Sequence, residues 1–213
     1  MFHNINTSTS IYLFIISIFL LSSCEDTPST ELDGFGDFVN SIEPVVGAND
    51  ITMDLKNDQS ENSKFLVTYS DIESNPMINN GQKKAWCVEW DISAVYGVQN
   101  NIKLYSTEGT EYWKKINYLL SRVEQFKVEN PDLGWREIQV VIWSLVRYKD
   151  FEIDKIPDYQ NLGRYYNNGE YLFDVELAKS MIEQVEAEAT ASGNQKFAII
   201  AENEGQTIIT ASE

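Results

Sequence analysis

The spacing of apolar residues changes twice along this chain of 213 residues, and those changes limit the folds it can adopt. Apolar and polar residues alternate, as in half-buried strands, at Ile51–Leu55, Phe65–Tyr69 and Ala85–Ile92. Beyond Asn100 the spacing becomes helical, and helices are expected from Thr110 to Phe126, from Pro131 to about Arg147, and from Asp174 to about Ala191. Alternation returns in a hairpin of Lys196–Ala201 and Thr207–Ala211. This order predicts an α+β fold, a β-sheet or sandwich framework with an inserted helical subdomain of about three helices.

The N-terminal segment has the features of an export signal. The first 23 residues contain no Asp, Glu, Lys or Arg, and Ile11–Leu21 is almost entirely apolar. The sequence Leu21-Ser22-Ser23-Cys24 is typical of a bacterial lipobox, which predicts cleavage before Cys24 and a lipid anchor, including palmitate, on that residue. We therefore expect a signal peptide at 1–23, a flexible acidic tether at 24–50 and a folded domain at 51–213. The acidic start of the tether, Glu25-Asp26, favours a membrane lipoprotein exposed on the cell surface.

The charge balance bears on the partners that the domain can have. The formal net charge is -17, and all of it lies after the uncharged signal. Nucleic acid needs a basic surface that neutralises phosphates, so a nucleic-acid partner is excluded. The membrane is expected as a partner only through the lipid anchor.

Few residue types remain for catalysis or metal binding in the mature chain. The single histidine, His3, is removed with the signal, and Cys24 is consumed by lipid. A histidine-based triad, a Cys-His dyad and a His-ligated zinc site are thus excluded, and we expect no metal or cofactor. Cys87 is left as the one free thiol, with no second cysteine for a disulfide.

Cys87 lies in a segment with two different faces. Strand alternation places Trp86, Val88, Trp90 and Ile92 on one face, and Ala85, Cys87, Glu89 and Asp91 on the other. A core cysteine would more naturally lie on the tryptophan face. The pattern therefore favours a special site for Cys87 that another part of the chain covers.

Gln139 is a polar residue on an apolar helical stripe. Trp135, Gln139 and Trp143 recur at a spacing of four residues and so share one face of the second helix. A buried carboxamide without a partner costs roughly 1–3 kcal/mol, so Gln139 is expected to have one. A thiol and a carboxamide held together in a dry pocket can lose ammonia and form an internal thioester.

Three short motifs occur in an order typical of one known family. They are Trp86-Cys87-Val88 in a strand, Tyr118-Leu119-Leu120 in a first helix, and Gln139-Val140-Val141-Ile142-Trp143 in a second. In these residues the chain resembles the bacterial thioester domain of surface adhesins. The resemblance implies that Cys87 and Gln139 form the thioester cross-link. It also implies covalent capture of a Lys amine or a hydroxyl on a protein or glycan surface, a single-use reaction and not enzymatic turnover.

The remaining candidate site residues would assist that bond. Glu89 and Asp91 lie on the face of Cys87 and are candidates for a base or proton shuttle, although a nearby carboxylate raises the pKa of a thiol. Trp86, Trp90, Trp135 and Trp143 are large apolar side chains that could shield a thioester from water.

Two other functions stay open on the sequence. The first is a noncovalent surface binding module of the same fold, in which Cys87 is a plain core residue and the loop Tyr159–Tyr171 binds the partner. The second is a hydrolase based on carboxylates, although no local pair of carboxylates marks one.

Overall fold

The structure is a computed structural model that describes residues 42–58, 62–189, 196–202 and 205–213. The expected signal peptide, Cys24 and most of the expected tether lie outside the described residues. Residues 42–50 belong to the folded domain, because Val45 and Ala48 are buried and hydrogen-bond with the main chain of Leu104. The domain therefore begins earlier than the boundary at residue 51 that the sequence suggested.

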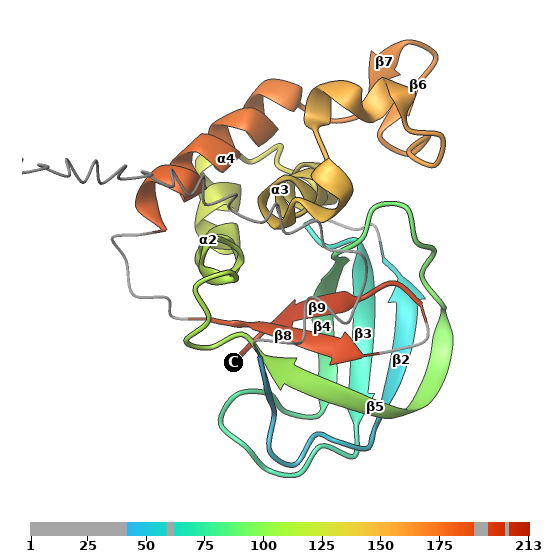
Figure 1. Cartoon of the computed structure of the whole chain (residues 1–213), viewed down its shortest axis with the longest axis vertical. Coiled ribbons are helices and arrows are strands. Elements are labelled where there is room, and N and C mark those ends of the chain that lie inside the picture. The colour runs from blue at the N-terminus through green and yellow to red at the C-terminus, as the bar shows by residue number, and fades with distance from the viewer. Residues whose placement is uncertain (1–41, 59–61, 190–195, 203–204) are drawn as a thin grey trace, which may run out of the picture. The chain divides into compact units, whose positions relative to one another are not determined.

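Seven of the described strands form one antiparallel sheet that closes into a barrel (Figure 1). Its strands are β1 (Glu43–Pro44), β2 (Ile51–Asn57), β3 (Phe65–Ser70), β4 (Gly81–Cys87), β5 (Gly97–Ser106), β8 (Ala198–Glu202) and β9 (Ile208–Ala211). They are ordered β1-β5-β2-β3-β4-β9-β8, and a further pairing of β5 with β8 closes six of them, with β1 added beside β5. The α+β class is confirmed, but the framework is a barrel and not a sandwich.

The helices are inserted between β5 and β8, as the sequence predicted. They are α2 (Lys114–Glu129), α3 (Trp135–Val146) and α4 (Val175–Glu188), with the short 3-10 turns η1 (Tyr148–Asp150) and η2 (Ile153–Asp158) and a small hairpin of β6 (Tyr166–Asn167) and β7 (Glu170–Tyr171). Figure 1 shows the three α-helices together on one side of the barrel. Their apolar faces share one continuous core with the barrel strands.

Glu137 fixes the starts of two of these helices. Its carboxylate accepts the main-chain N–H of Gly134, before α3, at 3.0 Å and that of Asp174, before α4, at 2.9 Å. Both groups are among the donors that a helix start leaves without an internal partner. Asp174 caps α4 as expected, by accepting the N–H of Leu177 at 2.9 Å. This pairing of helix starts sets the orientation of α3, which carries Gln139.

Strand β5 is the main element that the sequence reading missed. The polar pair Asn100-Asn101 interrupts its alternation, and Asn101 has a positive φ of 60°. The pairing of β2 with β5 shifts register at this point, between Ile51 and Met53, which is typical of a β-bulge. The irregularity at Asn101 breaks the alternation by which a strand is recognised in a sequence. The barrel depends on this strand, because β5 pairs with β1, β2 and β8.

Strand β4 ends at Cys87 and not at Ile92, so the expected alternation fails beyond the thiol. Val88 is still fully buried, whereas Ile92 is 37% exposed. The segment after Cys87 turns away to form the connection to β5. The expected starts of the first two helices were also early, because Glu111–Trp113 and Pro131–Asp132 form turns.

Candidate functional site

Cys87 occupies the last position of β4, where the strand has lost one of its neighbours. Strand β3 begins at Phe65, opposite Ala85, so the main chain of Cys87 extends past its end. On the other side β9 remains paired, with Ile208 opposite Cys87. The main-chain N–H and C=O of Cys87 would therefore be buried without a strand partner.

Gln139 supplies that partner from helix α3. Its Oε1 accepts the main-chain N–H of Cys87 at 3.0 Å, and its Nε2 donates to the main-chain carbonyl of Cys87 at 2.7 Å. Both residues are 0% exposed. This pair of bonds holds the Gln139 carboxamide against the main chain of the residue that carries the thiol.

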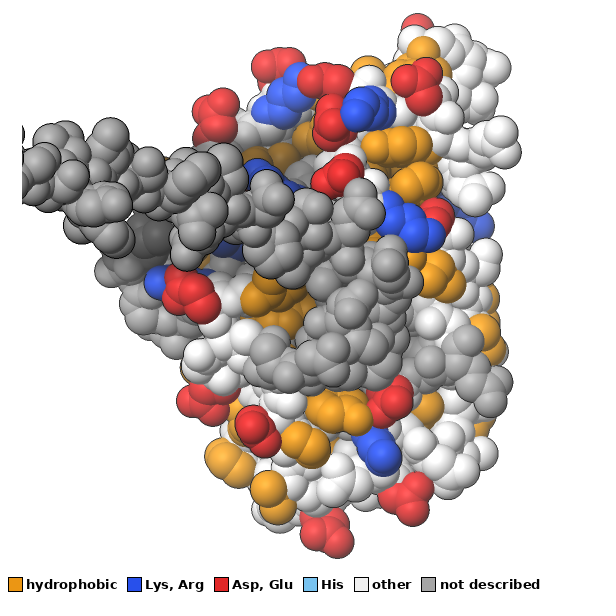
Figure 2. Space-filling model, viewed as in Figure 1, with side chains coloured by type: hydrophobic (Ala, Val, Ile, Leu, Met, Phe, Trp, Pro, Cys, Tyr) orange, Lys and Arg blue, Asp and Glu red, His pale blue; other side chains and the backbone are white. Residues whose placement is uncertain are grey.

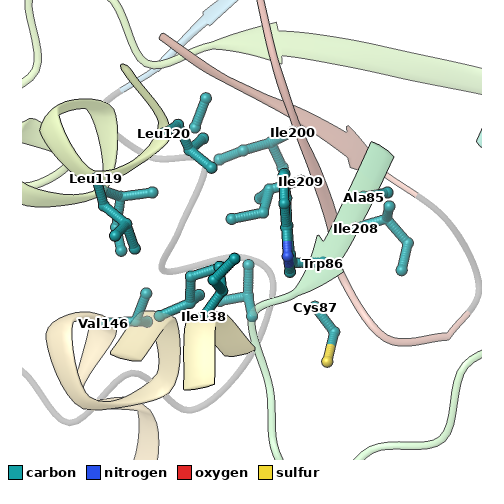
Figure 3. Packing of buried hydrophobic residues seen from close by; sticks show 14 of the residues in the cluster. Ala85, Trp86, Cys87, Leu119, Leu120, Ile138, Val146, Ile200, Ile208 and Ile209 are labelled. Atoms are coloured by element: carbon teal, nitrogen blue, oxygen red, sulfur yellow. The ribbon is translucent and has the colours of Figure 1, made fainter. Parts of the chain in front are cut away.

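The side chain of Cys87 is directed away from the part of the core that lies between the helices and the sheet. Figure 3 shows its sulfur pointing away from the cluster that contains Leu119, Leu120, Ile200 and Ile209. Instead the sulfur meets Lys64, whose Nζ lies 3.1 Å from it. Lys64 stands at a bend directly before β3. The lysine that contacts the thiol thus belongs to the segment directly before β3, on the side of β4 where the strand pairing stops.

Several groups act on the pKa of the Cys87 thiol. Burial raises this pKa, because it disfavours the charged thiolate. The ammonium of Lys64 opposes the rise, both through its charge and through its hydrogen bond, and the indole N–H of Trp143 acts in the same direction. The carboxylate of Glu89 adds to the rise. The net effect keeps Cys87 a thiol at neutral pH, with a cation placed to stabilise the thiolate whenever it forms.

Apart from the approach of the Trp143 indole N–H to the thiol, two buried donors have no hydrogen-bond partner within the described residues. They are Nε1 of Trp143, which is 0% exposed, and the hydroxyl of Tyr165, which is 2% exposed. Their rings lie 4.9 Å apart. Burial raises the pKa of Tyr165 well above its ordinary value, and the charge of a Cys87 thiolate adds to that rise. Leaving such donors unpaired costs roughly 1–3 kcal/mol each, and buried groups of this kind often have a chemical role.

A surface pocket of about 310 Å³ opens next to these residues. Its lining includes Lys64, Tyr96, Trp143, Arg164 and Tyr165. Cys87 itself is fully buried and does not line the pocket. Because Lys64, Trp143 and Tyr165 all act on the thiol, they form the layer between the pocket and the sulfur.

The four expected tryptophans divide between two places. Trp90 and Trp143 line the pocket, and Trp90 is stacked on Tyr159 with ring centroids 4.3 Å apart. Trp135 supports the pocket from behind through its edge contact with Tyr165 at 5.4 Å. Trp86 lies in the apolar core, where its Nε1 donates to the carbonyl of Asn62 at 3.1 Å.

The two carboxylates considered as bases are occupied elsewhere. Glu89 is 1% exposed and accepts the N–H of Thr207 at 2.7 Å and its hydroxyl at 2.5 Å. Burial raises the pKa of Glu89. Asp91 accepts from the ammonium of Lys149 at 2.7 Å. The hydrogen bonds found for both carboxylates in the described chain therefore lead away from Cys87, and Glu89 anchors the start of β9.

Within residues 42–58, 62–189, 196–202 and 205–213, no group of His, Cys, Asp and Glu side chains could hold a metal ion. None of the helices in these ranges is long and apolar enough to cross a membrane. Acidic and basic side chains lie interspersed on the described part of the face shown in Figure 2.

The sequence did not indicate Lys64 as a site residue, and it indicated Tyr165 only as part of the candidate binding loop Tyr159–Tyr171. Lys64 could have been found from its place directly before a predicted strand, had the pairing of β3 with β4 been known. Ten residues, Asp71–Asn80, connect these two strands, so the register cannot be read from a tight turn. Tyr165 lies in the aperiodic segment after α3, and nothing local distinguishes it from the neighbouring tyrosines.

Comparisons of the chain with models of protein families, with curated proteins and with solved structures find no match.

Proposed function

We propose that this protein is a surface-anchored lipoprotein adhesin that captures a partner covalently through an internal thioester between Cys87 and Gln139. The observation that carries the proposal is the pair of hydrogen bonds between the Gln139 carboxamide and the main chain of Cys87, at 3.0 and 2.7 Å. The likeness of the motif order to bacterial thioester domains supports the same conclusion. The chemistry uses only groups of this chain.

Formation of the bond requires attack by the Cys87 sulfur on the side-chain carbonyl carbon of Gln139. The C–N bond breaks, the thiol proton passes to the departing nitrogen, and ammonia leaves. The N–H of Cys87 already holds Oε1, where negative charge develops, and so acts as an oxyanion donor. The carbonyl of Cys87 holds Nε2, the leaving nitrogen. Fixed geometry of this kind can supply about 7–11 kcal/mol toward the barrier.

Capture of a partner reverses the role of the sulfur. A partner amine or hydroxyl attacks the Gln139 acyl carbon, an amide or ester forms, and the C–S bond breaks. Cys87 leaves as a thiolate, which the ammonium of Lys64 at 3.1 Å stabilises, and the proton that the nucleophile loses then converts the thiolate to the thiol. The pocket beside Lys64, Trp143 and Tyr165 is the approach path for the partner group. Before capture, the burial of Cys87 and Gln139 protects the thioester from water.

Labelling with a small primary amine tests the proposal. The purified mature protein is incubated with a fluorescent alkylamine, denatured, and mapped by peptide mass spectrometry. We expect one label per protein, attached through an amide at Gln139, together with a newly free Cys87 thiol. A protein that takes up no amine, and whose Cys87 is already free, would contradict the proposal.

The lipid anchor belongs to the same proposal but rests on the sequence alone. Acylation at Cys24 would hold the acidic domain at the membrane surface through the tether. Replacing Cys24 with alanine is expected to move the protein from the membrane fraction to the soluble fraction. Retention of the Cys24→Ala variant in the membrane fraction would argue against the anchor.

A noncovalent binding module is the second candidate, and one observation favours it. The two hydrogen bonds of Gln139 satisfy the main chain of Cys87 where β3 ends, which is a sufficient structural role for a buried glutamine. In that case the pocket would bind its partner reversibly, with part of the loop Tyr159–Tyr171 forming its wall. The amine-labelling experiment separates the two candidates, because a reversible module leaves the protein unlabelled after denaturation.

A further inference from the structure

Lys64 brings a primary amine to the proposed thioester from within the chain. Its Nζ lies 3.1 Å from the Cys87 sulfur. The same nitrogen lies 5.1 Å from the ring centroids of Phe65 and Trp143 and 6.0 Å from that of Tyr165. Trp143 is one helical turn beyond Gln139 on α3. Two independent contacts, with the thiol and with Trp143 of α3, therefore place this amine between Cys87 and the helix that carries Gln139.

We propose that Lys64 is an internal acceptor of the Gln139 acyl group, so that an unspent thioester closes into a Lys64–Gln139 isopeptide bond. This inference rests on the proposed function, because the acyl group must first be activated as the thioester. Lys64 in its free-amine form attacks the acyl carbon through Nζ. The C–S bond then breaks, and the Cys87 sulfur leaves and takes the proton that Nζ loses. The net change is one amide bond between Lys64 and Gln139, one ammonia released and the Cys87 thiol restored.

The reach of the side chain permits this step. Lysine carries its amine on a flexible stem of four carbons, so Nζ can move from the sulfur to the acyl carbon bonded to it. Intramolecular reactions with such placement have effective molarities of roughly 10⁵–10⁸ M, far above the concentration of a partner group in solution. A lysine ammonium is not nucleophilic, so the internal reaction proceeds only through the free amine. The interval before closure is the time in which a partner can be captured.

The consequence is a limited lifetime for the capturing state. Lys64 also lines the pocket through which a partner must approach, so partner and lysine compete for one acyl carbon. An amide is far less reactive than a thioester, and closure onto Lys64 thus disarms the molecule permanently. The thiol that is restored lies buried, as before.

A mass time course with methylamine distinguishes the two states of the bond. The thioester and the isopeptide both lack one ammonia relative to the sequence mass, but methylamine opens only the thioester. Freshly purified mature protein and protein aged at neutral pH are each weighed before and after methylamine treatment, then digested and examined by tandem mass spectrometry. In fresh protein we expect a mass deficit of one ammonia that methylamine reverses. In aged protein we expect the same deficit to resist methylamine, and a branched peptide that joins Lys64 to Gln139 to be present.

Three variants sharpen the experiment. In Lys64→Arg the mass deficit, whatever its extent, stays fully reversible by methylamine, because the arginine guanidinium cannot form the cross-link. Lys103→Arg, a change at an exposed lysine of β5, behaves as the natural protein does. Cys87→Ala shows neither a deficit nor a branched peptide.

The outcomes that overturn the inference can be told apart. If the aged natural protein stays fully reversible, or loses its deficit only by gaining water, Lys64 is not an acceptor and the proposed function stands. If neither fresh nor aged protein has a deficit, the proposed function and the inference fail together. A resistant cross-link in Cys87→Ala would exclude the route through the thioester.

Discussion

Replacing Gln139 with alanine is expected to lower the free energy of unfolding by about 2–5 kcal/mol relative to a chain that keeps the Gln139 carboxamide, as Cys87→Ala does. The change removes the two hydrogen bonds to the main chain of Cys87 and leaves a buried N–H and a buried C=O without partners. It also opens a cavity at a position that is 0% exposed. Urea unfolding of the mature protein, followed by tryptophan fluorescence, measures the effect.

Two variants serve as controls for this loss of stability. Cys87→Ala removes any cross-link but keeps the main-chain groups that Gln139 binds, so Gln139→Ala should be less stable than Cys87→Ala. Gln125→Ala changes an exposed glutamine of α2 and should alter stability by no more than about 0.5 kcal/mol. Equal stability of Gln139→Ala and Cys87→Ala would show that the two hydrogen bonds contribute nothing measurable.

Replacing Cys87 with alanine is expected to abolish covalent labelling by an amine, reducing it to the background of an unreactive protein. A carboxamide does not acylate an amine at neutral pH without activation, and the thioester is the only activated acyl group in the proposal. The fold should persist, because alanine retains the N–H and C=O that hold Gln139 in place. In-gel fluorescence after denaturation, together with peptide mapping at Gln139, measures the loss.

The controls for this second prediction use the same labelling. Gln125→Ala should be labelled to the extent of the natural protein, since it leaves the site untouched. Cys87→Ala should retain the far-ultraviolet circular dichroism of the natural protein, which shows that the loss of label is chemical and not a failure to fold. Undiminished labelling of Gln139 in Cys87→Ala would exclude the sulfur from the reaction.

The sequence could predict the helical insertion because its helices have strong apolar periodicity and clear start signals, such as Asp174 before α4. It could not predict closure of the barrel, since that depends on β5, whose alternation is broken at Asn101, and on β8, which follows the whole helical insertion. Pairings between such distant segments leave no local trace in the sequence. The same limit produced the sandwich expectation in place of a barrel.

The proximity of Cys87 and Gln139 was predicted because each residue contradicts its local pattern. Cys87 stands opposite the tryptophans of its strand, and Gln139 stands within an apolar stripe, so each called for a partner. The contact differs from the expected thiol–carboxamide pair, since the carboxamide binds the main chain of Cys87 at the point where β4 extends past the end of β3. Lys64 could not be foreseen, and Tyr165 could not be singled out within its loop, because ordinary surface lysines and loop tyrosines have the same sequence context.

The intact mass of the mature protein tests the central claim most directly. After allowance for signal removal and lipid, the natural protein is expected to weigh one ammonia less than its sequence requires, and both Cys87→Ala and Gln139→Ala are expected to have their full mass. A brief treatment of freshly purified protein with methylamine should add one methylamine and expose one thiol. A natural protein of full mass, with Cys87 free and unmodified, would contradict the thioester and leave Gln139 as a structural partner of the β4 main chain.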